Sequence, residues 1–290
     1  MAVEIGVWNV AGALGDNERE EQALEKIKRL DADVVILPEA CKAGLALDTA
    51  LMVQTQLGSE YVVAHVEYED KDDRLSSSAM LLLNRLPADS LTTAVRIGSR
   101  NAIYARVIDP GNGIVLRGLG VHFDDRSEAT RLLQAREAFY VLRDSEAIDD
   151  IVVEARNHIG DRQEFDGPQF IAGVLNSMPR RLVRARLGRS ALRLPAVYPT
   201  FVRPEISRFD RAANIASRLG GMSSGRTLQY LESVGFMGAD PSHSPTWPAR
   251  WPLAQLDHIM VAGDARVSMS TIHDDTGLSD HRAITATIET

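Results

Sequence analysis

The hydrophobic pattern of the first forty residues predicts a strand, a helix and a second strand. Residues 2–10 alternate between apolar and polar side chains, as a half-buried strand does. A Gly/Ala turn and a helix capped near Asp16 or Asn17 are expected next. The apolar face of this helix consists of Ala23, Leu24, Ile27 and Leu30. Residues 34–37 are continuously apolar and lead into Glu39, which predicts a buried strand with a carboxylate where the strand leaves the core.

Four further runs predict a meander of neighbouring strands, because they are rich in β-branched and aliphatic residues and are separated by turn-forming residues. These runs cover residues 61–68, 79–83, 102–108 and 114–123. A helix is then expected to begin near Ser127, with Leu132, Ala135, Phe139 and Leu142 at helical spacing. A more acidic helical stretch and a strand at 169–175 follow it.

The last part of the chain predicts a return to the same core. Residues 179–241 are Arg-rich and are expected to be helical or irregular, whereas residues 255–261 and 282–288 have strand patterns. No Pro/Ser-rich spacer, low-complexity tract or fixed-period repeat separates these segments. Strand-like segments at both ends indicate a shared core, so we predict one domain over residues 1–290.

Composition narrows the class of protein. The 290 residues are 44% hydrophobic and 25% charged, which is typical of a soluble globular chain and excludes a disordered one. The net charge of −8 argues against a generally basic surface for nucleic acid, although a local basic patch stays open. Cys41 is the only cysteine, which excludes an intramolecular disulfide and fits a reducing compartment.

The sequence carries no pattern that directs a protein to a membrane. Its N-terminus lacks the basic and apolar regions of a secretory signal, and no segment has the roughly 20 apolar residues of a membrane helix. We therefore expect a cytoplasmic protein without a membrane partner.

Polar groups follow apolar strands repeatedly along the chain. These segments are Trp8-Asn9, Pro38-Glu39, Val121-His122, Gly173 to Ser177, Leu256-Asp257-His258 and, in the turn before the last strand, Ser279-Asp280-His281. Strand ends are places where a rigid scaffold holds convergent side chains, so the repetition indicates a functional site. Singly, each residue also fits an ordinary structural role, such as a turn for Asn9 or a half-buried histidine for His122.

In order and spacing these segments resemble the endonuclease/exonuclease/phosphatase family from Trp8 to His281. The matching motifs are W-N-V at 8–10, L-P-E at 37–39, G-V-H-F at 120–123, A-G-V-L-N-S at 172–177, T-W-P at 246–248, L-D-H-I at 256–259 and S-D-H at 279–281. The resemblance implies an α/β fold, a four-layered α/β sandwich with two central mixed β-sheets flanked by helices. It also implies a metal-dependent phosphoester hydrolase.

The resemblance implies a metal site for Mg²⁺ or Mn²⁺. Glu39 matches the principal metal ligand of the family, and Asp280 looks like a further contributor to the metal shell. Glu39 with Asn9 and bound waters would form an all-oxygen ligand set, which suits these hard cations.

The same resemblance implies a catalytic unit. His281 matches the family's catalytic histidine, and Asp257 matches the acid that orients it and favours its charged form. His122 and Asn176 would complete a clamp on the phosphate. His281 would act as a stabilising cation, with proton transfer as an additional role.

Val174 departs from the family, which has Gly-Asp-x-Asn where this chain has Gly173-Val174-Leu175-Asn176. The missing Asp positions or deprotonates the attacking water, and losing a general base commonly costs about 10²- to 10⁴-fold in rate. Three explanations stay open. The valine is a substitution introduced to trap a substrate, a natural divergence to a binding role, or part of a rearranged site in which Asp124, Asp125 or Asp166 replaces the acid.

The substrate class is left between three hypotheses. Arg180, Arg181 and Arg184 begin an Arg-rich stretch soon after Asn176, which would suit a phosphodiester such as nucleic acid. The same arginines fit the solvated face of an amphipathic helix equally well. A metal-dependent phosphodiesterase or nuclease is the first hypothesis. A phosphatase of a small phosphorylated metabolite or lipid headgroup is the second, and a non-catalytic phosphate-binding protein is the third.

Overall fold

The computed structural model describes thirteen segments of the chain. They are residues 2–16, 18–42, 44–58, 60–68, 78–86, 91–98, 100–108, 111–124, 127–143, 167–176, 225–250, 252–274 and 277–290. The acidic helical stretch predicted after residue 143 and most of the Arg-rich segment, including Arg180, Arg181 and Arg184, lie outside these residues.

Two six-stranded sheets form the centre of the described structure. Sheet A has the strand order β11 (Arg266–Ile272), β12 (Ile284–Glu289), β1 (Ala2–Val7), β2 (Val34–Lys42), β4 (Ser78–Asn84) and β3 (Val62–Tyr68). Sheet B has the order β5 (Leu91–Ile97), β6 (Arg100–Ile108), β7 (Val115–His122), β8 (Gln169–Val174), β10 (Asp257–Ala262) and β9 (Met237–Gly238). Each sheet is mixed, because β1 pairs with β2 and β7 with β8 in parallel while the other neighbours are antiparallel.

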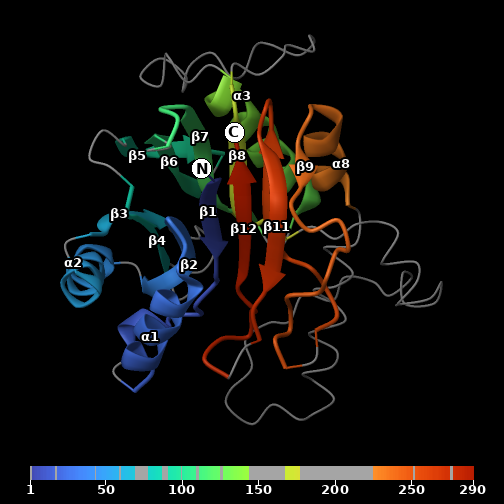
Figure 1. Cartoon of the computed structure of the whole chain (residues 1–290). Coiled ribbons are helices and arrows are strands. Elements are labelled where there is room, and N and C mark those ends of the chain that lie inside the picture. The colour runs from blue at the N-terminus through green and yellow to red at the C-terminus, as the bar shows by residue number, and fades with distance from the viewer. Residues whose placement is uncertain are drawn as a thin grey trace, which may run out of the picture.

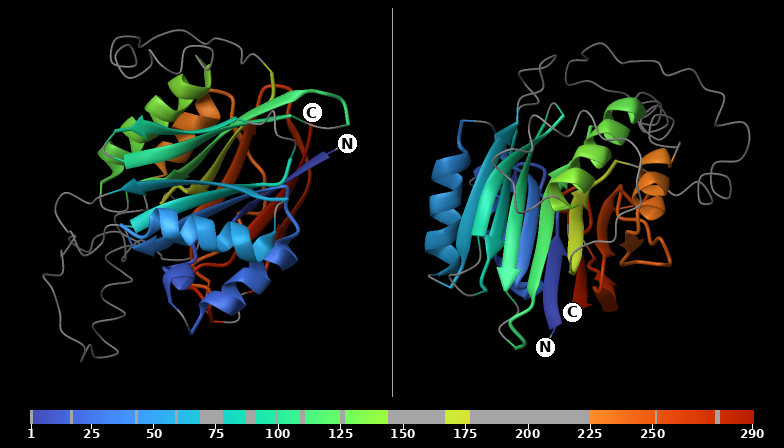
Figure 2. Two further views of the ribbon diagram at one scale, coloured as in Figure 1. Left: turned by 90° about the vertical axis from the view of Figure 1, so that its left-hand side faces the viewer. Right: turned by 90° about the horizontal axis from the view of Figure 1, so that it is seen from above.

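The four α-helices of the described residues cover the outer faces of the two sheets (Figure 2). Helices α1 (Glu20–Leu30) and α2 (Ala46–Leu57) pack on sheet A, and α3 (Glu128–Arg143) and α8 (Arg226–Ser233) pack on sheet B. A third apolar layer lies between the two sheets. The predicted four-layered sandwich is confirmed. None of the described helices is long and apolar enough to cross a bilayer.

The two ends of the chain lie side by side in sheet A (Figure 1). Strand β1 pairs with β12 along its whole length, from Ala2 opposite Glu289 to Val7 opposite Ile284. This pairing supports the single-domain organisation over residues 1–290, which stays a prediction.

The predicted meander is wrong. Strands β3 and β4 pair in sheet A, whereas β6 and β7 pair in sheet B, so the four runs form parts of two sheets. Hydrophobic patterning identifies a strand and its buried face, but it does not say which of two stacked sheets the strand joins.

Several boundaries and elements differ from the predicted ones. The first helix begins at Glu20, and its N-cap residue is Arg19, with no side-chain cap. Asp16 instead accepts hydrogen bonds from the Arg19 side chain and the Glu18 amide, and Asn17, the other predicted cap, lies outside the described residues. Its predicted apolar face is buried throughout. Helix α2 was not predicted, since Leu47 and Leu51 are exposed and blur its pattern. Strands β5, β9 and β11 were also missed, and β11 buries no side chain fully.

Candidate functional site

Three neighbouring strands of sheet B end in one row of buried side chains. Val174 on β8 is the register partner of His122 on β7 and of Asp257 on β10. On the same face of β8 and β10, Ala172, Phe170, Ile259 and Val261 belong to the apolar layer between the sheets. The row of three side chains therefore lies at the end of this inner face. His122, Val174 and Asp257 are 7%, 1% and 0% exposed. The structure thus brings three sequence-predicted positions together.

Sheet A contributes Asn9 and Glu39 to the same end of the sandwich. Asn9 lies two residues beyond Val7, and the amides of Trp8 and Val10 still donate to carbonyls of β2 after β1 has ended. The Asn9 side chain is buried, and its Oδ1 accepts a hydrogen bond from the Ala11 amide at 3.0 Å. A metal at Oδ1 would therefore use the second lone pair of this oxygen.

Glu39 owes its orientation to an irregularity in β2. The register between β2 and β4 shifts between Leu37 and Cys41, and Glu39 has a φ of 51°. Such a backbone is unfavourable for a glutamate and is stabilised by the Gly12 amide, which donates to the Glu39 carbonyl at 2.6 Å. The continuous strand beyond Pro38 was not predicted, and its bulge turns the carboxylate out of the core.

His281 and Asp257 form a buried pair. Nδ1 of His281 lies 2.8 Å from Oδ2 of Asp257, and Thr246 Oγ1 accepts the amides of Leu256 and Asp257. Burial alone would lower the pKa of His281, but the Asp257 carboxylate and more distant carboxylates raise it to about 9. The imidazole is therefore charged at neutral pH, and both of its nitrogens carry a proton.

This pair should make stability depend on pH. A histidine whose pKa is raised on folding stabilises the native state fully below the unfolded pKa of about 6.5, and this contribution is lost as pH rises through the folded pKa of about 9. In metal-free protein, we expect NMR titration of His281 to give a pKa well above 6.5, and Asp257→Asn to lower it. A pKa unchanged by Asp257→Asn would contradict the pairing.

His122 is the neutral partner in the site. Its Nε2 lies 3.4 Å from Oε1 of Glu39, so sheet B touches sheet A at this point. Burial, followed by the positive charges of Arg100 and His281, lowers the pKa of His122 well below its ordinary value. Nη1 of Arg100 also donates to the His122 and Phe123 carbonyls, at 3.2 and 3.0 Å, and so fixes the end of β7.

Asp280 and Glu39 line one pocket of about 540 Å³, here called the acidic pocket. Its lining is Ala11, Arg19, Glu39, Pro248, Ala249, Arg250, Gly277, Leu278, Ser279 and Asp280. Oδ2 of Asp280 accepts a hydrogen bond from the Trp247 indole at 3.0 Å. Ser279 Oγ donates to the Asn9 carbonyl at 2.6 Å and accepts the His281 amide at 3.0 Å, which links the two ends of the chain at the site.

Asn176 lies two residues beyond the end of β8. Its φ is 49°, and its Nδ2 donates to the Phe123 carbonyl at 2.8 Å. The amide therefore holds β7 and β8 together at the row of His122 and Val174.

The backbone before Val174 leaves no room for a side chain. Gly173 has a φ of 147°, and a Cβ there would lie 1.9 Å from the Val121 carbonyl oxygen. This close approach of β7 and β8 fixes the position of Val174 relative to its register partner His122.

Of the three acids that could replace the missing Asp, the structure describes only Asp124. Oδ1 of Asp124 accepts the Ser127 amide at 2.6 Å, just before α3 begins. Asp125 and Asp166 lie outside the described residues.

Three contributing residues were missed by sequence reasoning. Thr246, Trp247 and Ser279 belong to the motifs at 246–248 and 279–281, but only the structure shows that they bind the backbone of Asp257, the carboxylate of Asp280 and the amide of His281. Their place in these two motifs was the only indication in the sequence that they belong to the site.

The residues present fit a hard divalent cation that keeps most of its water. Mg²⁺ is usually bound by one or two carboxylates, with waters and substrate phosphate completing its shell, and Glu39 and Asp280 supply two in one open pocket. Within the described part of the chain, no group of three or more His, Cys, Asp or Glu residues is arranged to hold a metal alone. The donor set is thus that of an open site.

Comparison with known proteins gives the same fold. An endonuclease/exonuclease/phosphatase from Bacteroides vulgatus is 15% identical, with 100% of this chain and 99% of that chain covered and a TM-score of 0.59. The human nocturnin catalytic domain, solved with a bound sulfate anion, is 13% identical over 99% and 93%, with a TM-score of 0.59. A mannosyl-6-phosphatase from Bacteroides thetaiotaomicron is 12% identical over 99% and 100%, with a TM-score of 0.56. No curated protein matches the sequence.

These identities show the fold alone, whereas the family follows from the sequence. A sequence model of the Endonuclease/Exonuclease/phosphatase family matches residues 6–281, which includes every motif from Trp8 to His281. The chain therefore belongs to the endonuclease/exonuclease/phosphatase family, whose members are typically metal-dependent phosphoester hydrolases.

Proposed function

We propose that the protein is a divalent-metal-dependent phosphodiesterase whose water-activating position is occupied by Val174. One observation carries the proposal: Asp280 lines the acidic pocket with Glu39, and the next residue, His281, is hydrogen-bonded to the buried Asp257 at 2.8 Å. Two carboxylates for a cation and a charged imidazole for a phosphate thus lie at one end of the sandwich.

The site residues would divide the work as follows. Glu39 and Asp280, with the second lone pair of Asn9, would hold Mg²⁺ or Mn²⁺, and the cation would neutralise phosphate charge. His281, kept charged by Asp257, would donate from Nε2 to a phosphoryl oxygen as negative charge develops in the transition state. His122 would donate as a neutral imidazole, and Asn176 would keep β7 and β8 in place.

Val174 limits the reaction to slow turnover. An isopropyl group neither orients nor deprotonates water, so the chain would bind metal and phosphate but lack the base. We therefore expect the protein to bind metal and phosphate well but to hydrolyse the diester slowly. If a carboxylate at position 174 does not restore turnover, a purely phosphate-binding role follows.

The test is hydrolysis of bis(4-nitrophenyl) phosphate and of single- and double-stranded DNA, with Mg²⁺, with Mn²⁺ and with EDTA. We expect slow, metal-dependent turnover of at least one diester, abolished by Glu39→Gln. Glu25→Gln on the exposed face of α1 is the control. Turnover that survives both EDTA and Glu39→Gln would contradict a metal-dependent site.

Trp247→Phe is expected to weaken metal binding. The indole donates to Oδ2 of Asp280 at 3.0 Å, and phenylalanine keeps the ring but loses this donor. Removing a hydrogen bond to a metal-binding carboxylate typically costs about 10- to 100-fold in metal affinity. Titration of Mn²⁺ by electron paramagnetic resonance measures this affinity. An unchanged affinity, with an unchanged fold by circular dichroism, would remove Asp280 from the metal shell.

A further inference from the structure

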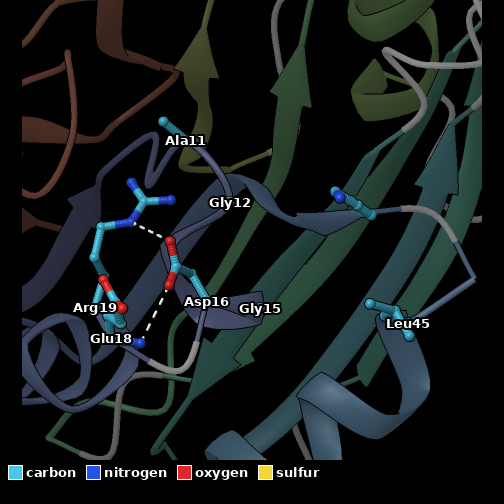
Figure 3. Close-up of a pocket in the computed structure, with 8 residues that line it drawn as sticks. Ala11, Gly12, Gly15, Asp16, Glu18, Arg19 and Leu45 are labelled. Carbon is cyan, nitrogen blue, oxygen red and sulfur yellow. Dashed lines mark hydrogen bonds and ion pairs between the residues drawn. The ribbon is translucent and has the colours of Figure 1, made fainter.

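A second pocket adjoins the acidic pocket and is not used by the proposed chemistry. Its lining is Ala11, Gly12, Gly15, Asp16, Glu18, Arg19, Lys42 and Leu45 (Figure 3). Its volume of about 580 Å³ is within the range of roughly 300–1,000 Å³ that small-molecule sites occupy. Ala11 and Arg19 line both pockets, so the two pockets lie next to each other at these residues.

Arg19 is held rigidly at the boundary between the two pockets. Its Nε donates to Oδ2 of Asp16 at 2.8 Å, and its Nη1 donates to the Leu278 carbonyl at 3.2 Å. Within the described structure no residue accepts a hydrogen bond from Nη2. Figure 3 shows the guanidinium extending from Asp16 towards Ala11, on the side of the pocket opposite Leu45. Because the group is planar, fixing two nitrogens also fixes the direction in which the third donates.

The charges of the second pocket balance. Asp16 is occupied, since its two oxygens accept the Arg19 side chain and the Glu18 amide. The Arg19 hydrogen bond lowers the pKa of Asp16, so its negative charge offsets that of the guanidinium. Glu18 and Lys42 are exposed and opposite in sign, and neither side chain has a partner among the described residues.

Without a bound cation, the two carboxylates of this lining disfavour a second anionic group. A phosphate in the pocket would have to lie beside the carboxylates of Glu18 and Asp16, whereas a neutral group with several hydroxyls could donate to Glu18 and accept from Lys42. Gly12 leaves space in the turn, because a Cβ there would contact nothing within 4 Å. Leu45 is 43% exposed and offers an apolar surface to the C–H groups of a ring.

We infer that the second pocket binds the alcohol part of the substrate, and that this part is an uncharged polyhydroxylated ring such as a hexose or a ribose. Arg19 contacts the phosphate where it joins the ring. The inference rests on the proposed function: hydrolysis of the diester breaks the bond between phosphorus and the oxygen of the ring-bearing alcohol, and the other ester bond stays intact. Water supplies the new oxygen on phosphorus together with one proton, and the alcohol leaves with the other proton of that water.

The test is a binding comparison that does not require turnover. Isothermal titration calorimetry of the full chain with Mg²⁺ would use glucose 6-phosphate, ribose 5-phosphate, propyl phosphate and inorganic phosphate. Each of these probes carries the phosphate and at most one of the two alcohol groups of a diester. We expect at least one sugar phosphate to bind about tenfold more tightly than propyl phosphate, which has no hydroxyls, and the tighter sugar identifies the ring. Lys42→Met and Glu18→Gln should each reduce this ratio several-fold. Lys28→Met and Glu25→Gln, a charged pair on α1 outside the pocket, are the matched controls.

The outcomes separate this inference from the proposed function. Binding of inorganic phosphate and propyl phosphate with no preference for a sugar phosphate would overturn the assignment of the second pocket and leave the phosphate site intact. A sugar preference that Lys42→Met and Glu18→Gln both leave unchanged would also overturn it. Failure of all four probes to bind would contradict the phosphate site itself, and the inference would fall with it.

Discussion

Val174→Asp is expected to raise metal-dependent phosphodiester hydrolysis by about 10²- to 10⁴-fold, the usual contribution of a general base. The register of β7, β8 and β10 places this side chain between His122 and Asp257, and Asp257 already holds His281. A carboxylate at 174 would therefore meet the attacking water with the rest of the site in place. The measurement is kcat/KM for bis(4-nitrophenyl) phosphate with Mn²⁺.

Val174→Asn is the matched control, because its side chain has nearly the shape of Asp but cannot take a proton. The gain should be absent in Val174→Asn and should be lost again when His281→Ala is added to Val174→Asp. Equal rates for Val174→Asp and Val174→Asn would mean that the missing acid is not what limits this chain, and would favour the binding role.

Gly173→Ala is expected to lower the free energy of unfolding by roughly 3 kcal/mol or more. The added methyl would lie 1.9 Å from the Val121 carbonyl oxygen, and the φ of 147° is unfavourable for alanine. Backbone cannot yield as a flexible side chain does, so β7 and β8 would have to separate where His122 and Val174 are paired. Urea denaturation measures the loss.

Gly238→Ala serves as its control in a strand of the same sheet. A Cβ at Gly238 meets nothing within 4 Å, so this change should alter the free energy of unfolding by no more than about 0.5 kcal/mol. Equal stability of the two variants would show that β7 and β8 tolerate a side chain at 173, and that their close approach does not fix Val174.

Several strands and the first helix could be predicted from the sequence, because the central strands are nearly continuously apolar and the helix has a continuous apolar face. The four layers followed from the resemblance to the family. The distribution of strands between the sheets could not, since β3 and β6 have similar patterns but pair in different sheets. Helix α2 could not be predicted either, because exposed leucines interrupt its alternation of apolar and polar faces.

The candidate site could be predicted as a set of positions but not as a set of contacts. Motif order identified Asp257 and His281, and the structure places them 2.8 Å apart. Nothing in the sequence indicated the bulge that turns Glu39 or the bond from Trp247 to Asp280, because both depend on distant parts of the chain. The position of Arg19 could not be predicted from the sequence, because the residue that it contacts, Leu278, lies 259 positions away.

The central claim, that Glu39 and Asp280 bind a divalent cation beside the His281–Asp257 pair, is tested most directly by anomalous diffraction from crystals soaked with Mn²⁺ and inorganic phosphate. The account predicts a Mn²⁺ peak within about 2.5 Å of a carboxylate oxygen of each acid, with phosphate on the side of His281. Mn²⁺ bound elsewhere, or no Mn²⁺ at either carboxylate at millimolar concentrations, would contradict it.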